Sequence, residues 1–295
     1  MPGTRSSLYG GRHRSVLEHP DHVRGINHGQ MTITAITELA PSVTRLTAVL
    51  EHEGDPERWD VTNPAIRLEL DDPSSGTTVS RVYTVRSVRN GELGIEIDID
   101  VVRHSGASVV MTWLAQLEVG SRTRILGPRA HFTPHVDPQL PVGLFADETA
   151  IPALATIIRD WPDQKIGHAW IETPDRAVLE DLPAHPGVTV HWLERSPREA
   201  PATTGRLVDA ALGFSDAHPE PLSIWACGEH GEMKQIRDHF RKTRELPREQ
   251  VVVFGYWRRL VSSSQIDEER LQRYERALAR DPRMTVLDDF DDSEE

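Results

Sequence analysis

The spacing of apolar residues changes its period near residue 140, and this change constrains the fold more than any other feature of the sequence. Before that point, short β-branched segments alternate polar and apolar residues, and turn residues such as Asn90-Gly91 separate them. Several short strands of this kind predict a small antiparallel barrel. The six segments lie at residues 32–36, 43–50, 65–70, 81–85, 93–99 and 122–126, and a helix-like stretch at 108–117 interrupts them.

A proline-containing stretch at residues 133–141 ends this pattern, and strands and helices alternate after it. Strands that alternate with helices predict a doubly wound, Rossmann-like and mostly parallel sheet. Such sheets bind ligands at the carboxyl ends of their strands, here near residues 146–149 and 226–229. The strand-like segments lie at residues 142–146, 167–171, 189–193, 222–226 and 250–254, with helices expected near 151–158, 229–243 and 266–279.

The length of the chain supports two domains. It has 295 residues, more than one hydrophobic core of about 100 to 200 residues needs. Six of its last eight residues are acidic, and such a run is typical of a solvated tail. We expect an irregular lead-in at 1–30, a barrel domain at 31–132, a linker at 133–141, an α/β domain at 142–280 and an acidic tail at 281–295.

Composition excludes several classes of function. The single cysteine, Cys227, rules out an internal disulfide framework and any cysteine-based iron–sulfur or zinc site. His19 and His22 lack carboxylate or cysteine partners at ligand spacing, so we expect no metal site. No apolar run approaches the ~20 residues of a membrane span, and the first residues lack the apolar stretch of a signal peptide. We therefore expect a cytoplasmic protein without membrane contact, and a monomer.

Charge is distributed unevenly. The net charge of −13 argues against a nucleic-acid partner, because such a field repels phosphates. Without the six acids of the tail it becomes −7, with 33 bases against 40 acids. The segment 229–259 has the opposite bias, with eight bases against five acids. This segment suits an anionic ligand, or equally a solvated helix face with ion pairs four residues apart.

One strand carries a candidate flavin motif. In Arg81-Val82-Tyr83-Thr84-Val85-Arg86, alternate side chains point to opposite faces of the strand. An arginine can hold a pyrophosphate, a tyrosine can stack on an isoalloxazine, and a threonine hydroxyl can meet a flavin ring nitrogen. The same string also suits an ordinary strand, because tyrosine and threonine favour strands and cross-strand ion pairs would explain the arginines.

Three further segments accompany this motif in chain order. They are His104 with Trp113-Leu114-Ala115 and Leu126-Gly127-Pro128-Arg129, then GLFADETAIPA at 143–153, and then WACGE at 225–229 leading to GYWRR at 255–259. With these segments the sequence resembles the siderophore-interacting protein family, which are flavin-dependent ferric-siderophore reductases of ferredoxin-reductase-like architecture. The resemblance spans about residues 32–260. It implies a Greek-key FAD-binding barrel followed by an NAD(P)H-binding domain.

The resemblance also implies roles for individual residues. Arg81, Tyr83 and Thr84, with the Val82 backbone, would bind FAD, and His104 would contact it. Asp147, Glu148 and Thr149 would line the cleft that faces the flavin and the nicotinamide. From the residues alone, a lone histidine after a strand such as His104 is more often a surface or hydrogen-bonded histidine, and residues 147–149 could equally form a helix N-cap.

The sequence departs from the family in one place. The glycine and proline that usually precede the tryptophan, and let a pyrophosphate approach the backbone, are replaced by Ser108-Val109-Val110-Met111-Thr112. Ser108 and Thr112 still offer hydroxyls to FAD. This departure puts close approach of the phosphates in doubt.

We therefore predict an oxidoreductase in which NAD(P)H reduces FAD, and reduced FAD reduces Fe(III) held by a siderophore. The flavin carries this chemistry, so no protein acid, base or nucleophile is expected. Without a G-x-G-x-x-G string, the sequence does not distinguish NADH from NADPH. The candidate substrate-docking residues are Lys234, Arg237, Arg241, Tyr256, Trp257 and Arg258.

Two alternatives stay open. The same architecture suits a reductase that works with ferredoxin or flavodoxin. A non-catalytic siderophore-binding or regulatory protein would also fit if the change at 108–111 had weakened FAD binding.

Overall fold

Six antiparallel strands close into a barrel in the N-terminal half of the protein, as the period-two pattern predicts. A computed structural model describes residues 27–52, 56–104, 106, 108–262 and, beyond these, 265, 266, 269, 272, 275 and 276. Most of the predicted lead-in, most of the helix expected at 266–279, and the acidic tail lie outside the described residues. The barrel strands are β1 (His28–Ala40), β2 (Val43–His52), β3 (Pro64–Asp72), β4 (Thr77–Gly91), β5 (Gly94–Val102) and β6 (Arg122–Ala130).

The order of these strands around the barrel is β1-β2-β5-β4-β3-β6, in which β2 pairs with β5 rather than with β3. This is a Greek-key connection. Side chains such as Met31, Leu46 and Ile97 fill the interior and are fully buried. Two short helices accompany the barrel, η2 (Pro56–Trp59) and α2 (Val109–Gln116). The helix expected at 108–117 is therefore confirmed.

A five-stranded parallel sheet follows, with the order β11-β10-β7-β8-β9. Its strands are β7 (Val142–Asp147), β8 (Gly167–Thr173), β9 (Val188–Glu194), β10 (Ser223–Glu229) and β11 (Val251–Trp257). The chain moves from the edge strand β9 back to the other side of β7 before it forms β10, so the topology switches between β7 and β10. This confirms the doubly wound sheet, and the switch point is where such sheets bind ligands.

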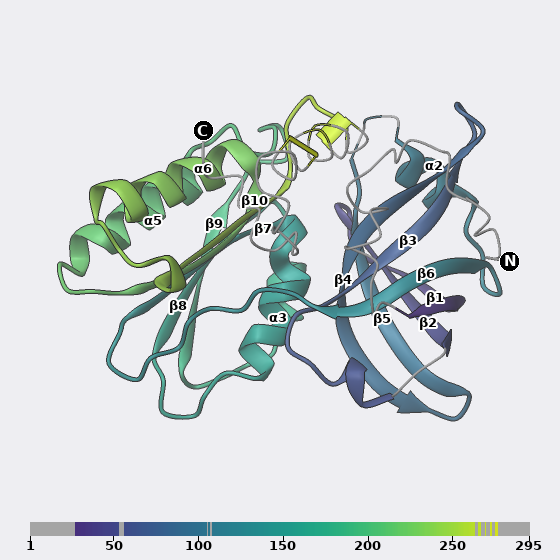
Figure 1. Ribbon diagram of the computed structural model, residues 1–295, viewed down its shortest axis with the longest axis horizontal. Helices are drawn as coiled ribbons and strands as arrows, with labels where there is room; N and C mark the ends of the chain where they lie inside the picture. Colours follow the sequence, from purple (N-terminus) through teal and green to yellow (C-terminus); the bar gives the residue numbers. More distant parts are fainter. Residues whose placement is uncertain are drawn as a thin grey trace, which may run out of the picture. The chain divides into compact units, whose positions relative to one another are not determined.

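Helices cover both faces of the sheet (Figure 1). The helix α3 (Ile151–Arg159) buries Leu154 and Ile158 against one face. On the other face, α5 (Arg206–Ala217) and α6 (His230–Asp238) pack through Phe214 and Met233 against the apolar core. Short elements complete the layers: η3 (Glu148–Ala150), α4 (Ala177–Glu180), η4 (His239–Thr243) and η5 (Arg248–Gln250).

The barrel and the sheet share apolar and polar contacts within one compact unit, residues 26–260. Ala40 and Val43 of the barrel belong to the same buried cluster as α3. The Trp225 indole on β10 donates to the Phe132 carbonyl just after β6, at 3.2 Å. The segment 133–141 has no helix or strand, and Lys165 Nζ donates to the Asp137 carbonyl within it at 2.6 Å. A shared buried cluster and the Trp225–Phe132 hydrogen bond therefore join the barrel to the sheet.

Candidate functional site

The predicted flavin motif lies in the middle of β4, where alternate residues face opposite sides as expected. Tyr83 is opposite Ile66 on β3 and packs against the barrel core, and Val85 is fully buried in that core. Thr84 is opposite Ala65, whose other cross-strand neighbour is Arg129 on β6. Arg129 and Thr84 therefore lie in one row across three strands. Sequence reasoning did not single out Arg129 as a candidate, although it lies in the Leu126-Gly127-Pro128-Arg129 string.

The motif residues keep part of their surface accessible. Val82 is 49% exposed, and Arg81, Tyr83 and Thr84 are half-buried. Arg81 Nη1 donates to the Ser80 carbonyl at 2.7 Å. Burial raises the pKa of the Tyr83 phenol further above physiological pH. This stretch of β4 combines a cation, an aromatic ring and a hydroxyl, which fit a phosphate and a flavin ring.

The second part of the predicted FAD site is the start of α2. Ser108 is its N-cap, and the Ser108 hydroxyl accepts from the Met111 amide at 3.2 Å. His104 is exposed, and its Nε2 lies 3.4 Å from the Ser108 hydroxyl. The half-buried Thr112 donates its amide to the Ser108 carbonyl at 3.0 Å. A capped helix start next to a histidine suits a phosphate group.

The departure at 109–111 has a structural explanation. Val110 is buried, and Val109 and Met111 pack against the barrel core. Tyr83 packs against the same core. The three side chains at 109–111 therefore contribute to the apolar core, and the hydroxyls of Ser108 and Thr112 are the groups that this helix start offers to FAD.

At the carboxyl edge of the sheet, Asp147 connects three strands and a helix. Its Oδ1 accepts from the Thr149 amide at 2.9 Å and from the Thr149 hydroxyl at 2.5 Å, which caps η3. Its Oδ2 accepts from the Trp257 indole, at the end of β11, at 2.7 Å. Gly228 on β10 leaves the space for this carboxylate, because a Cβ there would lie 2.8 Å from Asp147 Oδ2. Asp147 is therefore an N-cap, as the N-cap interpretation predicts, but of the short turn η3, because α3 begins after Ala150 without a side-chain cap.

Several more carboxylates gather at the same edge. Glu148 and Glu172 both contact the guanidinium of Arg195, and all three side chains are at least nine-tenths buried. Glu229 accepts from the amides of Gly231 and Glu232 at the start of α6, at 2.6 and 3.1 Å. Glu232 is 7% exposed, and one of its oxygens has no hydrogen-bond partner in the part of the chain that the structure describes.

Burial controls the charge of this carboxylate group. It raises the pKa of Asp147, and it raises the pKa of Glu148 to about 7 even though Arg195 lowers it. Glu172 also has a raised pKa. Burial, followed by the neighbouring Glu172, Asp147 and Glu229, raises the pKa of Glu232 to about 7. Near neutral pH the edge therefore carries less negative charge than its composition indicates.

The candidate substrate residues fall into two groups. Tyr256 and Trp257 end β11, and Arg258 follows them at the carboxyl edge. The basic residues of α6 and η4 instead contact the protein itself. Arg237 is buried, Lys234 pairs with Asp238 at 2.9 Å, and Arg241 donates to the carbonyl of Val251, the first residue of β11, at 2.9 Å.

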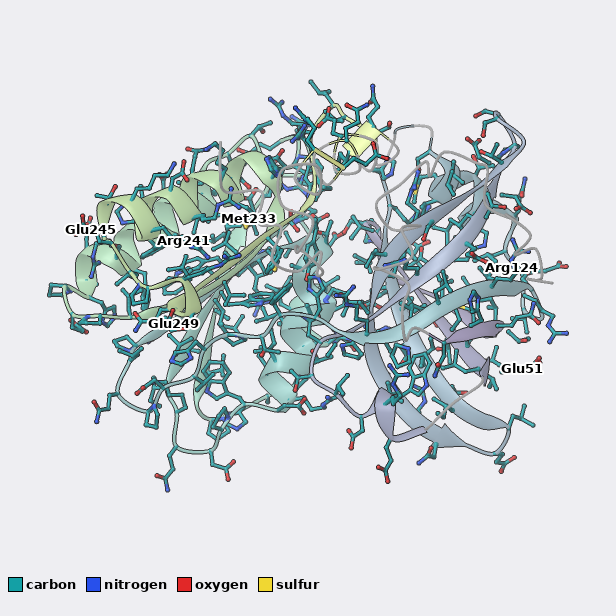
Figure 2. The ribbon with its side chains drawn as sticks, viewed as in Figure 1. Glu51, Arg124, Met233, Arg241, Glu245 and Glu249 are labelled. Atoms are coloured by element: carbon teal, nitrogen blue, oxygen red, sulfur yellow. The ribbon has the colours of Figure 1, made fainter. Side chains whose placement is uncertain are left out.

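A strand of seven residues is about 20 Å long, so Arg241 and Trp257 lie at opposite ends of β11. Figure 2 shows Arg241 on the α6 side of the sheet, with Glu245 and Glu249 nearby. Glu51 and Arg124 lie on the barrel in the same view. The structure thus does not bring the six candidate docking residues together.

The fold defines a class: a closed Greek-key barrel joined to a doubly wound parallel sheet, an arrangement also present in the solved cytochrome P450 reductase GcoB of Amycolatopsis, at 18% identity and a TM-score of 0.56 over 79% of this chain and 70% of that one. Two family profiles match the chain, "Siderophore-interacting FAD-binding domain" over residues 44–132 and "Siderophore-interacting protein" over residues 141–260. The chain belongs to the siderophore-interacting protein family.

Individual relatives agree with this assignment. The chain is 34% identical to the ferric acinetobactin reductase of Acinetobacter baumannii, over 94% of each chain. It is 27% identical to the ferric vibriobactin reductase ViuB of Vibrio cholerae, over 65% of this chain and 69% of ViuB. The solved siderophore-interacting protein of A. baumannii superimposes with a TM-score of 0.80 at 34% identity, covering 87% of this chain and 100% of that one.

Within the residues that the structure describes, no helix combines the length and the apolar character needed to cross a bilayer.

Proposed function

We propose that this protein is a flavin-dependent ferric-siderophore reductase that uses NAD(P)H as its electron donor. The observation that carries the proposal is the joining, in one compact unit, of the β4 motif and capped α2 with a sheet whose topological switch point adjoins β7, which ends at Asp147. The chemistry that FAD supplies when bound is the acceptance of a hydride from a nicotinamide and the delivery of single electrons to Fe(III). The siderophore-bound iron is the substrate, and its reduction weakens its hold on hard oxygen ligands.

The barrel residues would hold FAD. Arg81 supplies a positive charge for a phosphate, and the start of α2, with Ser108, Thr112 and His104, supplies a second phosphate-binding element. Tyr83 and Thr84, with the Val82 backbone, would contact the flavin ring. Arg129, in register with Thr84 through Ala65, adds a second cation beside the same stretch of β4.

The sheet residues shape the donor side. Asp147 accepts three hydrogen bonds, so its carboxylate fixes the loop and the Trp257 ring. These three bonds make Asp147 a positioning group in this proposal. Asp147 and Thr149 would line the nicotinamide cleft at the helix start, where a doubly wound sheet binds dinucleotides. No residue of the chain needs to exchange protons with the iron chelate.

A ferric siderophore would dock at the carboxyl edge, near Tyr256, Trp257 and Arg258. Arg258 offers a cation there for an anionic chelate, whereas Lys234, Arg237 and Arg241 contribute to the fold and would be secondary at most. We further propose that residues 31–132 and 142–280 are the two functional domains, linked by 133–141. A monomeric state, a cytoplasmic location and the lack of a nucleic-acid partner stay predictions.

An iron-release assay tests the proposal. The FAD-loaded protein is mixed anaerobically with NADH or NADPH, a ferric siderophore and a colorimetric Fe(II) trap, with the FAD-free protein as the control. We expect Fe(II) to form only with FAD and a donor. A protein that cannot be loaded with FAD but binds the ferric siderophore would contradict the proposal and favour the non-catalytic alternative. If Fe(II) formed only with reduced ferredoxin or flavodoxin, the reductase assignment would stand and only the choice of NAD(P)H as donor would be wrong.

A further inference from the structure

Two arginines and two aspartates form an ion-pair network where the barrel meets the sheet. Arg45 on β2 pairs with Asp100 on β5, Nε to Oδ1, at 2.7 Å, and with Asp181, just after α4, at 2.7 Å. Arg86 on β4 contacts the same Asp181 oxygen at 2.5 Å, and it also donates to the Asp181 carbonyl. The side chains of Arg86 and Asp100 are only 7% and 4% exposed. The barrel thus supplies three of the four charges, and the sheet domain supplies Asp181.

A second aspartate holds the other end of α4 to the barrel. Asp175, which follows β8 and precedes α4, accepts from the Ser42 amide, between β1 and β2, at 3.0 Å. The segment that leaves the carboxyl end of β8 is therefore attached to the barrel on both sides of α4. That end of β8 adjoins the edge at which a doubly wound sheet binds its ligand.

The network is not needed to keep the two domains together. A separate junction of neutral groups joins them, in which the Asn63 amide donates to the Thr156 hydroxyl on α3 at 2.9 Å. The Asn63 side chain and the Trp225 indole both donate to the Phe132 carbonyl, at 2.9 and 3.2 Å. The Phe132 ring also stacks on Phe254 with 4.4 Å between centroids. With this junction intact, loss of the ion pairs would leave the domains joined but free to rotate slightly.

Arg86, unlike Arg45, is poorly arranged for stability alone. Arg86 Nη1 is buried and has no hydrogen-bond partner within the described part of the chain. Burial lowers the pKa of Arg86 in spite of Asp100 and Asp181. Buried ion pairs of this kind add little net stability, because desolvation offsets the attraction, but their geometry fixes the relative position of the elements that carry them. Arg86 lies two residues beyond Thr84, so the element it fixes is the flavin strand itself.

We propose that Arg86 and Asp181 are positioning residues that align the flavin strand β4 with the carboxyl edge of the sheet for electron transfer from NAD(P)H. The inference rests on the proposed function. The last arginine of the 81–86 motif thereby acts through the domain junction and not as a ligand of FAD. Hydride transfer requires the reacting atoms to be within about 3.5 Å, and a displacement of about 1 Å can lower its rate about 100-fold.

The test replaces Asp181, whose side chain is 31% exposed, by alanine. Asp238→Ala is the matched control, because Asp238 is 32% exposed and contacts two cations, Lys234 at 2.9 Å and Lys242 at 3.1 Å, within one helical segment. For each protein, FAD affinity, the melting temperature and the rate of flavin reduction at saturating NADH or NADPH are measured anaerobically. The hydrogen isotope effect with deuterated donor is measured over a range of temperatures.

For Asp181→Ala we expect FAD affinity within about twofold of the native value and flavin reduction slowed by about 10- to 100-fold. The isotope effect should also become more temperature-dependent, because the donor–acceptor distance is less well fixed. Asp181→Glu, which keeps the carboxylate, should recover part of the rate, and Asp238→Ala should reduce flavin at the native rate.

Three results would overturn the inference: native flavin-reduction kinetics in Asp181→Ala, a rate loss that only follows loss of FAD or of folded protein, or a native protein that neither dinucleotide reduces. After the third result, the assignment as a ferric-siderophore reductase would still stand if the ferric siderophore reoxidised flavin that had been reduced chemically. It would fail if that reoxidation were absent.

Discussion

Gly228→Ala is the substitution whose effect follows most directly from the geometry of the carboxyl edge. The new Cβ would lie 2.8 Å from Asp147 Oδ2 and 2.9 Å from its Cγ, closer than real Cβ atoms come. Asp147 would have to move, and its Oδ2 holds the Trp257 indole at 2.7 Å. Hydrogen bonds to charged groups contribute about 1.5–3 kcal/mol, and a buried carboxylate left unpaired costs a comparable amount. We therefore expect the free energy of unfolding to fall by about 2–3 kcal/mol.

The measurement is urea unfolding at pH 7, followed by tryptophan fluorescence. Gly213→Ala is the control, because Gly213 is within α5 and a Cβ there meets nothing within 4 Å. An alanine in a helix interior is favoured over glycine by about 0.5–1 kcal/mol, so this control should be more stable than the native protein. Destabilisation of Gly228→Ala by less than about 0.5 kcal/mol, below the range given for such a bond, would refute the role assigned to Asp147 and Trp257.

Two further predictions concern cofactor and pH. Arg81→Ala should weaken FAD binding about 10- to 150-fold, the equivalent of a charge-assisted phosphate contact. The control Arg124→Ala removes an exposed cation of the same barrel, paired with Glu69 at 3.0 Å, and should leave FAD affinity unchanged. Equal FAD affinities of the two variants in a fluorescence titration would show that β4 does not bind FAD. Because Glu148 and Glu232 have folded-state pKa values of about 7, above the ordinary carboxyl range, their contribution to stability is full below about pH 4.5 and is lost as the pH rises through 7. Between pH 5 and 7.5 the free energy of unfolding should therefore fall by about 1–3 kcal/mol less in Glu232→Gln than in the native protein, as measured by urea unfolding. The same pH dependence in both proteins would contradict a buried Glu232 with a raised pKa.

The fold was predictable because it depends on local periodicity. Period-two segments identify the barrel strands, and strands alternating with helices identify the sheet. The helix α5 was missed, although Leu207, Ala211 and Phe214 are spaced along one helical face and are buried. Gly205 at its start, Gly213 within it and the prolines on both sides obscured a pattern that is only twelve residues long.

The site was predictable only in part, because several of its contacts join distant segments. The Arg86–Asp181 pair spans 95 residues, and the Trp257–Asp147 bond spans 110, so no spacing in the sequence reveals either one. The carboxylates at the carboxyl edge come from the ends of three different strands and the start of α6: Asp147, Glu172, Glu229 and Glu232. For the basic segment 229–259, the sequence predicted a docking surface that the contacts do not support. Its composition suits an anionic ligand, but Lys234 forms an ion pair with Asp238, four residues along its own helix.

The most direct test of the reductase assignment is an anaerobic absorbance titration of the FAD-loaded protein. The account predicts that one equivalent of NADH or NADPH bleaches the flavin bands, and that the ferric siderophore restores them at two Fe(III) per flavin, since each iron accepts one electron. Reduced flavin that stays bleached in excess ferric siderophore would contradict the account.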